Sequence, residues 1–333
     1  MVIIKSTNIK TICTKSIAFV FALLFITSCK TDINTKSYFT EYGSLLWINN
    51  TIPDSLVKKA VKSTVENSSI IIAQIPWDPI DENFMENIDW YNKLAIQHGK
   101  ELMINIDWLN NNRKTTRNGE WSFEDDAIKI QFSKSINSLV EKYKPKYLML
   151  GVEVNYYAFT SPEPYKAFVN IFNSLKNSLK EIYPKMEIGL SFQLELLYGI
   201  DKDWAHLKSL EPLDVIVENL DFIGISTYPD LNFNKERLNI KSVINLDSLF
   251  VLYDVPIGIS ETGISSTNFN LNQRSLYVEN IFTRSNQLHF IIWGSMIDSY
   301  KKDNWMSRIG LLDYNALPKN EYNQWLEGIA GLK

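Results

Sequence analysis

Two glutamates stand at the ends of two apolar stretches that have the composition of buried strands. Glu153 follows the stretch 147–152, Glu261 follows the stretch 256–260, and each opens a loop. Two carboxyl groups facing one cleft can hydrolyse a glycosidic bond with retention, because one attacks the anomeric carbon while the other protonates the leaving oxygen. Either glutamate alone could equally cap the helix that follows it. Finding both at matched strand ends favours catalysis.

The elements that would position this pair follow a repeating order of strand and helix. The strand runs are rich in Ile, Leu, Val and Phe, as is typical of parallel strands covered on both faces. We expect strands at 44–49, 69–74, 101–106, 146–151, 187–191, 221–226, 256–260 and 289–293, and helices at 53–66, 82–98, 123–143, 163–183, 202–217, 234–253, 272–285 and 320–329. Eight repeats predict an α/β fold, a (β/α)8 TIM barrel in a single domain. The alternative, an open doubly wound sheet, lacks support because no Gly-rich phosphate fingerprint follows a strand.

Barrel enzymes carry their chemistry on the loops that follow the strands. Acids, amides and aromatics gather there in this sequence, and the candidate substrate-binding residues are Trp77, Asp78, Asp107, Trp108, Asn155, Tyr228 and Trp293. The tryptophans can stack on a sugar ring or pack in the core. The aspartates can bind sugar hydroxyls or cap their own loops.

Alternation along a strand predicts where the two glutamates point. Glu153 shares a strand face with Met149 and Gly151, and Glu261 shares one with Ile259. If these faces line the barrel, both carboxyl groups point into its mouth.

Catalytic glutamates after the fourth and seventh strands are the hallmark of the clan A glycoside hydrolases, and the chain resembles that clan. Three segments are similar to family 53, the endo-β-1,4-galactanases: Gly151-Val-Glu-Val-Asn155, Asp221-Phe-Ile-Gly-Ile-Ser-Thr-Tyr-Pro229 and Ile259-Ser-Glu-Thr-Gly263. The resemblance implies that Glu153 is the acid/base and Glu261 the nucleophile. It also implies that Tyr228 lies near the nucleophile, that Trp293 floors the sugar site, and that the substrate is a β-linked polysaccharide or oligosaccharide, with galactan favoured.

The sequence departs from the clan at two supporting positions. Val152 stands where the clan usually has an Asn that binds the sugar 2-OH, and Asn155 is a candidate replacement for it. Gln74 stands near the end of the second strand, where the clan usually has an Arg that keeps the nucleophile ionised. Without that cation the pKa of Glu261 should rise. A non-catalytic, glycan-binding surface lipoprotein on a degenerate barrel is therefore the alternative function, and a barrel with lyase chemistry is a third.

The N-terminus predicts export. Three lysines precede a short apolar run, and small residues lead to Cys29, a pattern that resembles a bacterial lipobox. An ordinary signal peptide with a chance cysteine is the alternative. We expect a signal peptide at 1–28, a lipid on Cys29, a tether at 29–40 and the barrel at 41–333. The protein would be a membrane lipoprotein of the cell envelope, bound to the membrane through its N-terminal lipid.

Composition narrows the remaining classes. The formal net charge is −4 and no basic stripe occurs, so we expect no nucleic-acid partner. The three histidines have no metal-ligand spacing, and we expect neither a metal nor a cofactor. No Gly-x-Ser-x-Gly motif marks a serine hydrolase. The sequence leaves the sugar, the linkage, endo or exo action and the oligomeric state open.

Overall fold

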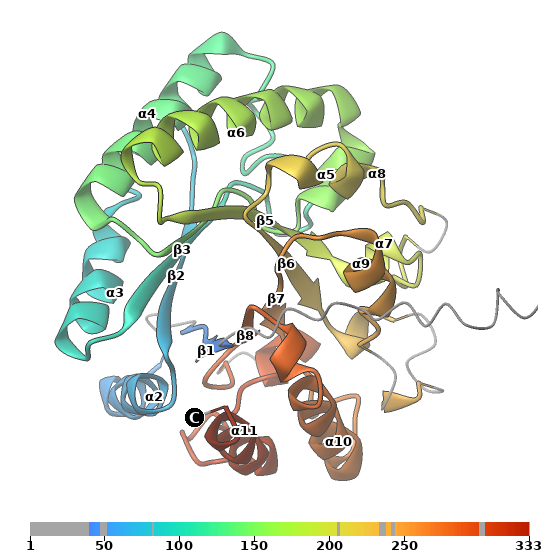
Figure 1. The fold of residues 1–333 in the computed structure, drawn as a ribbon. Helices are drawn as coiled ribbons and strands as arrows, with labels where there is room; N and C mark the ends of the chain where they lie inside the picture. Colours follow the sequence, from blue (N-terminus) through green and yellow to red (C-terminus); the bar gives the residue numbers. More distant parts are fainter. Residues whose placement is uncertain are drawn as a thin grey trace, which may run out of the picture. The chain divides into compact units, whose positions relative to one another are not determined.

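The structure is a computed structural model that describes residues 40–46, 52–81, 83–204, 207–232, 238–240, 244–299 and 304–332. All of these residues lie in one compact unit, Ser37–Lys333. Predicted positions 1–39, with the signal peptide, Cys29 and most of the tether, lie outside the described residues. Figure 1 shows strands surrounded by helices, which confirms the predicted (β/α)8 barrel in a single domain.

Eight parallel strands form the barrel wall in the order β1-β8-β7-β6-β5-β4-β3-β2. Their bounds are β1 (Glu41–Ser44), β2 (Ile70–Pro76), β3 (Glu101–Asp107), β4 (Tyr147–Met149), β5 (Glu187–Gln193), β6 (Phe222–Thr227), β7 (Ile257–Thr262) and β8 (Phe290–Trp293). Ser69 closes the barrel between β1 and β2. Its N–H donates to the Tyr42 carbonyl at 2.8 Å, and its Oγ accepts from the Tyr42 N–H at 2.8 Å.

Long amphipathic helices cover the wall (Figure 1). They are α2 (Asp54–Glu66), α3 (Glu86–Gln97), α4 (Asp126–Tyr143), α6 (Pro162–Ile182), α10 (Leu271–Phe282) and α11 (Asn320–Ala330). Sequence signals set two of their starts, because Asp125 caps α4 through the Ala127 N–H and Asn270 forms a capping box with Gln273. Short elements fill the connections: α5 (Val154–Thr160), α7 (Leu194–Leu197), α8 (Glu211–Asp214), α9 (Asp247–Leu252), η1 (Val217–Asn219), η2 (Pro229–Leu231), η5 (Ser285–Gln287) and η6 (Trp305–Arg308).

Three predicted elements differ from the structure. β1 begins at Glu41 rather than at 44, because 41–44 pairs in register with Phe290–Trp293 of β8. The helix predicted at 202–217 is reduced to α8 and η1, and 202–204 instead lie at the opening of a cavity. Of the helix predicted at 234–253, only α9 is observed, and part of that stretch lies outside the described residues.

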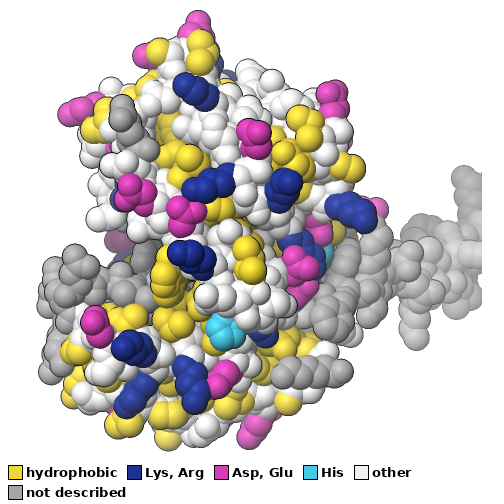
Figure 2. All heavy atoms as spheres, turned by 90° about the vertical axis from the view of Figure 1, so that its left-hand side faces the viewer, with side chains coloured by type: hydrophobic (Ala, Val, Ile, Leu, Met, Phe, Trp, Pro, Cys, Tyr) yellow, Lys and Arg dark blue, Asp and Glu magenta, His cyan; other side chains and the backbone are white. Residues whose placement is uncertain are grey.

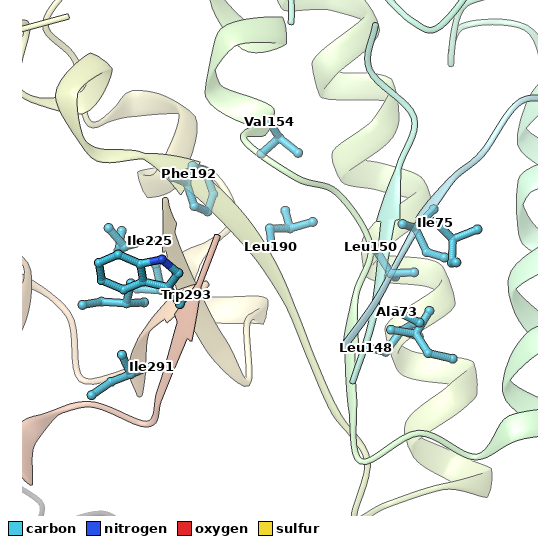
Figure 3. Close-up of a cluster of buried hydrophobic side chains, with 14 of the residues drawn as sticks. Ala73, Ile75, Leu148, Leu150, Val154, Leu190, Phe192, Ile225, Ile291 and Trp293 are labelled. Atoms are coloured by element: carbon cyan, nitrogen blue, oxygen red, sulfur yellow. The ribbon is translucent and has the colours of Figure 1, made fainter. Parts of the chain in front are cut away.

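Apolar side chains form two layers, one on each face of the barrel wall. The outer layer packs under the helices and includes the residues labelled in Figure 3, such as Leu148, Ile225 and Ile291. The inner layer fills the lower barrel, where the Phe222 ring of β6 contacts the Phe290 ring of β8 at a centroid distance of 5.3 Å. A Cβ on Gly258 would lie 2.4 Å from the Phe290 ring, so this glycine makes room for it.

Above the inner apolar layer the barrel interior turns polar. Ser191 of β5 and Ser260 of β7 are hydrogen-bonded at 3.0 Å although β6 lies between their strands, so this bond crosses the interior. Ser226 and Asn105 are also fully buried at this level. The apolar lower layer thus fixes the barrel, while the polar upper layer lies beneath its mouth.

Candidate functional site

Glu153 occupies a strained position where the chain leaves β4. Its backbone is left-handed, with φ 52° and ψ 42°, and α5 begins at the next residue. A non-glycine residue in such a conformation costs about 1–3 kcal/mol, and such residues cluster at functional sites. Its Oε1 accepts a hydrogen bond from Ser226 Oγ at 2.6 Å, and its Oε2 lies 2.8 Å from Arg113 Nε. The carboxylate is therefore held on both oxygens.

Arg113 is the functional residue that the sequence reasoning missed. It lies in the loop after β3, has φ 63°, and is one of four described non-glycine residues with positive φ, together with Glu153. Its NH1 lies 2.6 Å from Asp107 Oδ1, so its guanidinium bridges Asp107 and Glu153. Burial opposes the charge on Arg113, but Asp107, Glu153 and Glu261 together raise its pKa. The clan usually has its cation at the end of the second strand, whereas in this chain Arg113, in the loop after β3, is a cation whose charge acts on Glu261.

Glu261 reaches the mouth through an irregularity in β7. Ile257 and Ile259 pack in the outer apolar layer, so Glu261 does not share their face and the predicted alternation is wrong. The register of β7 against β6 shifts beside Ile259 and Ser260, and against β8 between Ile259 and Thr262. The shift lets Ser260 and Glu261, which are neighbours in sequence, both face inward.

The predicted alternation is also wrong after β4, where Met149 and Gly151 lie on opposite sides of the barrel wall. Met149 belongs to the inner layer, but a Cβ on Gly151 would lie 2.5 Å from Val154 and 3.1 Å from Trp108, on the outer side. The strand ends at Met149, so the position of Glu153 is set by the turn and its left-handed backbone.

The environment of Glu261 favours its protonated form. Burial raises its pKa, and the nearby charge of Glu153 raises it further, against the opposing effects of Tyr228 and Arg113. Tyr228 donates its O–H to Glu261 Oε1 at 2.5 Å. The higher pKa agrees with the loss of the strand-2 cation, although burial is the larger cause.

One cavity of about 850 Å³ contains this chemistry. Glu153, Glu261, Asp107, Arg113 and Tyr228 all line it. The structure therefore brings the predicted glutamate pair together with two predicted substrate-binding residues, Asp107 and Tyr228. Within the described part of the chain no group of three or more His, Cys, Asp or Glu side chains could hold a metal ion.

The three predicted sugar-stacking tryptophans have packing roles instead. Trp77, Trp108 and Trp293 are at most 1 % exposed and belong to the outer apolar layer. Trp108 Nε1 donates to the Leu150 carbonyl at 2.9 Å and Trp293 Nε1 to the Ile309 carbonyl at 2.7 Å. Figure 3 shows Trp293 among aliphatic side chains of the outer layer. A ring enclosed on both faces cannot stack on a sugar, so we correct these predictions.

Asn155 and Asp78 also lie away from the cavity lining. Asn155 is fully buried, and its amide donates to the Gln193 carbonyl at 3.0 Å and accepts from the Gln193 N–H at 2.8 Å. It ties the loop after β4 to β5 and does not replace the missing Asn. Asp78 accepts from Asn118 at 2.5 Å and from the Ile80 N–H at 3.1 Å, which makes it a loop-capping residue.

Val152 and Gln74, the two residues that depart from the clan pattern, have different surroundings in the structure. Val152 lies in the inner apolar layer and is 2 % exposed, so it offers no polar contact to a ligand. Gln74 lines the cavity, but among the described residues its amide has no hydrogen-bond partner, and no bond joins it to Glu261. Among the cations that the structure describes, Arg113 is the one whose charge lowers the pKa of Glu261.

Different aromatics line the opening of the cavity. Trp204 lies near Tyr156, with ring centroids 6.0 Å apart, and Trp305 lies near Tyr228 at 5.1 Å. The Tyr156 O–H donates to the buried Asp201 at 2.7 Å, which fixes that ring. The sequence held a signal for Trp204 and Trp305. Each lies among charged and polar residues in a long stretch after β5 or β8, where a tryptophan is more often exposed than buried.

Comparisons with known proteins identify the fold. No protein-family model matches the chain, and no curated protein matches it. A family 39 glycoside hydrolase from Bacteroides cellulosilyticus WH2 has a TM-score of 0.60 at 13% identity, over 90% of this chain and 65% of its own. The exo-β-1,4-mannosidase Op5Man5 from Opitutaceae bacterium strain TAV5 has a TM-score of 0.65 at 13% identity, over 89% and 62%.

A subfamily 18 member of glycoside hydrolase family 5, from Bifidobacterium longum subsp. infantis, has a TM-score of 0.65 at 13% identity, over 88% of this chain and 79% of its own. The chain spans less than two thirds of the length of the first two structures. Its structural neighbours are clan A glycoside hydrolases, and the similarity establishes the (β/α)8 barrel that they share. The narrower resemblance to family 53 stays a prediction.

Proposed function

We propose that the protein is a retaining glycoside hydrolase that acts on a β-linked polysaccharide or oligosaccharide. The observation that carries the proposal is the cavity in which Glu153 and Glu261 face the same space with Arg113 and Tyr228. Two carboxyl groups with different environments are the minimum that this chemistry needs. Similarity in fold to glycoside hydrolases supports the same class.

The resemblance to the clan A hydrolases, whose catalytic glutamates follow the fourth and seventh strands, supports Glu153 as acid/base and Glu261 as nucleophile. Glu261 attacks the anomeric carbon as a carboxylate, and Glu153 protonates the leaving oxygen and then takes a proton from the water that releases the sugar. Glu261 must therefore lose its proton first. Arg113 and Tyr228 lower its pKa against burial, so they are the groups that make this possible.

The finer parts of the proposal rest on the sequence. Galactan is the favoured substrate because of the three segments that resemble family 53. Cys29 and the residues before it support export and a lipid anchor. No helix among the described residues is long and apolar enough to cross a bilayer.

The proposal is tested by product analysis of the purified protein on a panel of β-linked glycans, with Glu153→Gln and Glu261→Gln alongside. We expect reducing-end products from at least one glycan and loss of turnover in both variants. Turnover that survives in Glu261→Gln would exclude the assignment. Unsaturated products that absorb in the ultraviolet would indicate a lyase instead.

A second candidate is a non-catalytic glycan-binding protein. Val152 in the inner layer and the free amide of Gln74 favour it, since both positions support catalysis in the clan that the chain resembles. It predicts glycan binding without products and with unchanged affinity in Glu261→Gln. Products that vanish in that variant would reject it.

A further inference from the structure

The opening of the cavity is more basic than the protein as a whole. Lys114, Arg117 and Lys202 line it, and Asp203 is the exposed carboxylate among the same lining residues. The chain carries a formal net charge of −4. On the face drawn in Figure 2, acidic and basic side chains are interspersed. Because the protein as a whole is acidic, its overall composition does not explain the cations at this opening, the rim of the cavity.

The carboxylates deeper in the cavity already have donors. Asp107 and Glu153 are bound by Arg113, Glu261 accepts from Tyr228, and Asp201 accepts from Tyr156. In the described structure none of these carboxyl groups is paired with a cation of the rim.

The rim cations lack such partners. No salt bridge joins Lys114, Arg117 or Lys202 to a carboxylate in the ranges that the structure describes. By contrast, Lys176 at the barrel periphery lies 2.8 Å from Asp221. Cations that stay in contact with water carry little cost, but three of them lining one cavity raise the local concentration of anions.

Trp204 connects this charge to sugar binding. Lys114 Nζ lies 4.9 Å from the centre of the Trp204 ring, which holds the ammonium group against the aromatic surface. A sugar that stacks on this ring brings its substituents within reach of Lys114. Ring stacking and charge pairing would then act on one sugar unit.

We propose that the substrate is an anionic glycan, and that Lys114, Arg117 and Lys202 bind a carboxylate or sulfate on a sugar at the rim, beside Trp204. The inference rests on the proposed glycan substrate and narrows its class. The acidic group is disfavoured on the floor, since the carboxylates of Asp107 and Glu153 would repel it there. The cleaved bond therefore lies at least one sugar away from the charged substituent.

The test compares three oligosaccharides of one backbone: neutral, bearing uronate, and sulfated. We expect a higher kcat/KM for one of the two anionic forms, which also distinguishes carboxylate from sulfate. Added salt should lower that kcat/KM and leave the neutral substrate unaffected. The double variant Lys114→Met, Lys202→Met should lose about five- to tenfold more kcat/KM on the anionic substrate than on the neutral one.

Lys59→Met is the matched control, because Lys59 is exposed on α2, has no ion pair among the described residues and does not line the cavity. It should leave both kcat/KM values unchanged. Equal losses on neutral and anionic substrates in the double variant, or a preference for the neutral form, would overturn the inference.

Binding separates failure of this inference from failure of the proposed function. If no glycan is turned over, titration calorimetry of the Glu261→Gln protein with the same three oligosaccharides still tests the rim. Tighter, salt-sensitive binding of an anionic form supports the inference without catalysis. Equal affinity for the neutral and the anionic oligosaccharides, or no binding of either anionic form, refutes the inference.

Discussion

Glu153 and Glu261 share a cavity, but their surroundings differ. Glu153 is 8 % exposed and has an ion pair with Arg113 and a hydrogen bond from Ser226, whereas Glu261 is 4 % exposed and has the neutral Tyr228 as its hydrogen-bond donor. The cation lies on the residue assigned as acid/base, and burial raises the pKa of the residue assigned as nucleophile. Burial and the charge of Glu153 therefore oppose the ionised form of Glu261 that attack requires, and Tyr228 and Arg113 favour it.

The largest effect should come from replacing the pair itself. Glu261→Gln removes the nucleophile and should abolish turnover of every substrate. Glu153→Gln removes the acid, which contributes about 10²–10⁴-fold. Dinitrophenyl glycosides need no proton on their leaving group, so Glu153→Gln should keep a kcat/KM on them near that of the intact protein, while kcat falls because the water that releases the covalent sugar has lost its base. Kinetics on both substrate types check this, and the opposite pattern would reverse the two roles.

Arg113→Met should produce the next largest effect. It removes the cation between Asp107 and Glu153 and takes away one of the two influences that lower the pKa of Glu261. Breaking a buried pair costs about 3–5 kcal/mol. We expect a large loss of kcat/KM at neutral pH, with the acidic limb of the pH profile moved upward.

The matched control is Arg284→Met, because Arg284 pairs with the exposed Asp247 away from the cavity. It should leave the pH profile in place. An Arg113→Met profile with an unshifted acidic limb would show that Arg113 does not act on the charge of Glu261.

Tyr228→Phe should have a smaller effect in the same direction. It deletes the hydrogen bond to Glu261, and a bond to a charged group contributes about 1.5–3 kcal/mol. Since Tyr228 lowers the pKa of Glu261, its loss should raise that pKa and weaken activity most at acidic pH. Tyr143→Phe on α4, which removes a bond to Asp89, serves as the control. Equal activity of both variants across pH would reject the role of Tyr228.

The smallest effect concerns Glu195, a buried carboxyl that does not line the cavity. Burial raises its pKa to about 8, against hydrogen bonds from Thr227 and the Tyr228 N–H. A folded-state pKa above the unfolded one means that stability is greatest below the ordinary pKa of a glutamate and falls as pH rises toward 8. The Tm should therefore decline across this window.

Glu195→Gln should flatten that decline, since the new amide does not titrate. It can keep the contact with Gln193 if the Gln193 amide turns over, because Gln193 Oε1 has no partner in the described structure. Thermal unfolding at several pH values measures the effect. A wild-type Tm that rises from pH 5 to pH 8, or an unchanged slope in the variant, would contradict this account.

The barrel could be predicted because its signals are local and repeated. Each strand is a short apolar run, and each long helix has an amphipathic period, as in α4 and α10. Placing the glutamates at the ends of β4 and β7 followed from counting these runs. The predictions that failed are the long helices at 202–217 and 234–253, where the described residues form only the short elements α8, η1 and α9.

The supporting residues could not be predicted from alternation. Trp77, Trp108 and Trp293 end their strands on the outer face, and a single sequence does not say which face is outer. Glu261 faces the mouth because of a register shift, and no residue type marks a shift of this kind. The position of Arg113 depends on the path of a loop that carries several cations. Among the described residues of this loop, Arg113 is the cation that pairs with Glu153.

The central claim is that Glu261 is the nucleophile of a retaining mechanism, despite its raised pKa. An activated 2-fluoro glycoside of the sugar found by product analysis should form a stable covalent adduct, which peptide mass spectrometry can locate. The account predicts one adduct on the peptide that carries Glu261, with none in Glu261→Gln. An adduct on Glu153, or rapid turnover without any adduct, would contradict it.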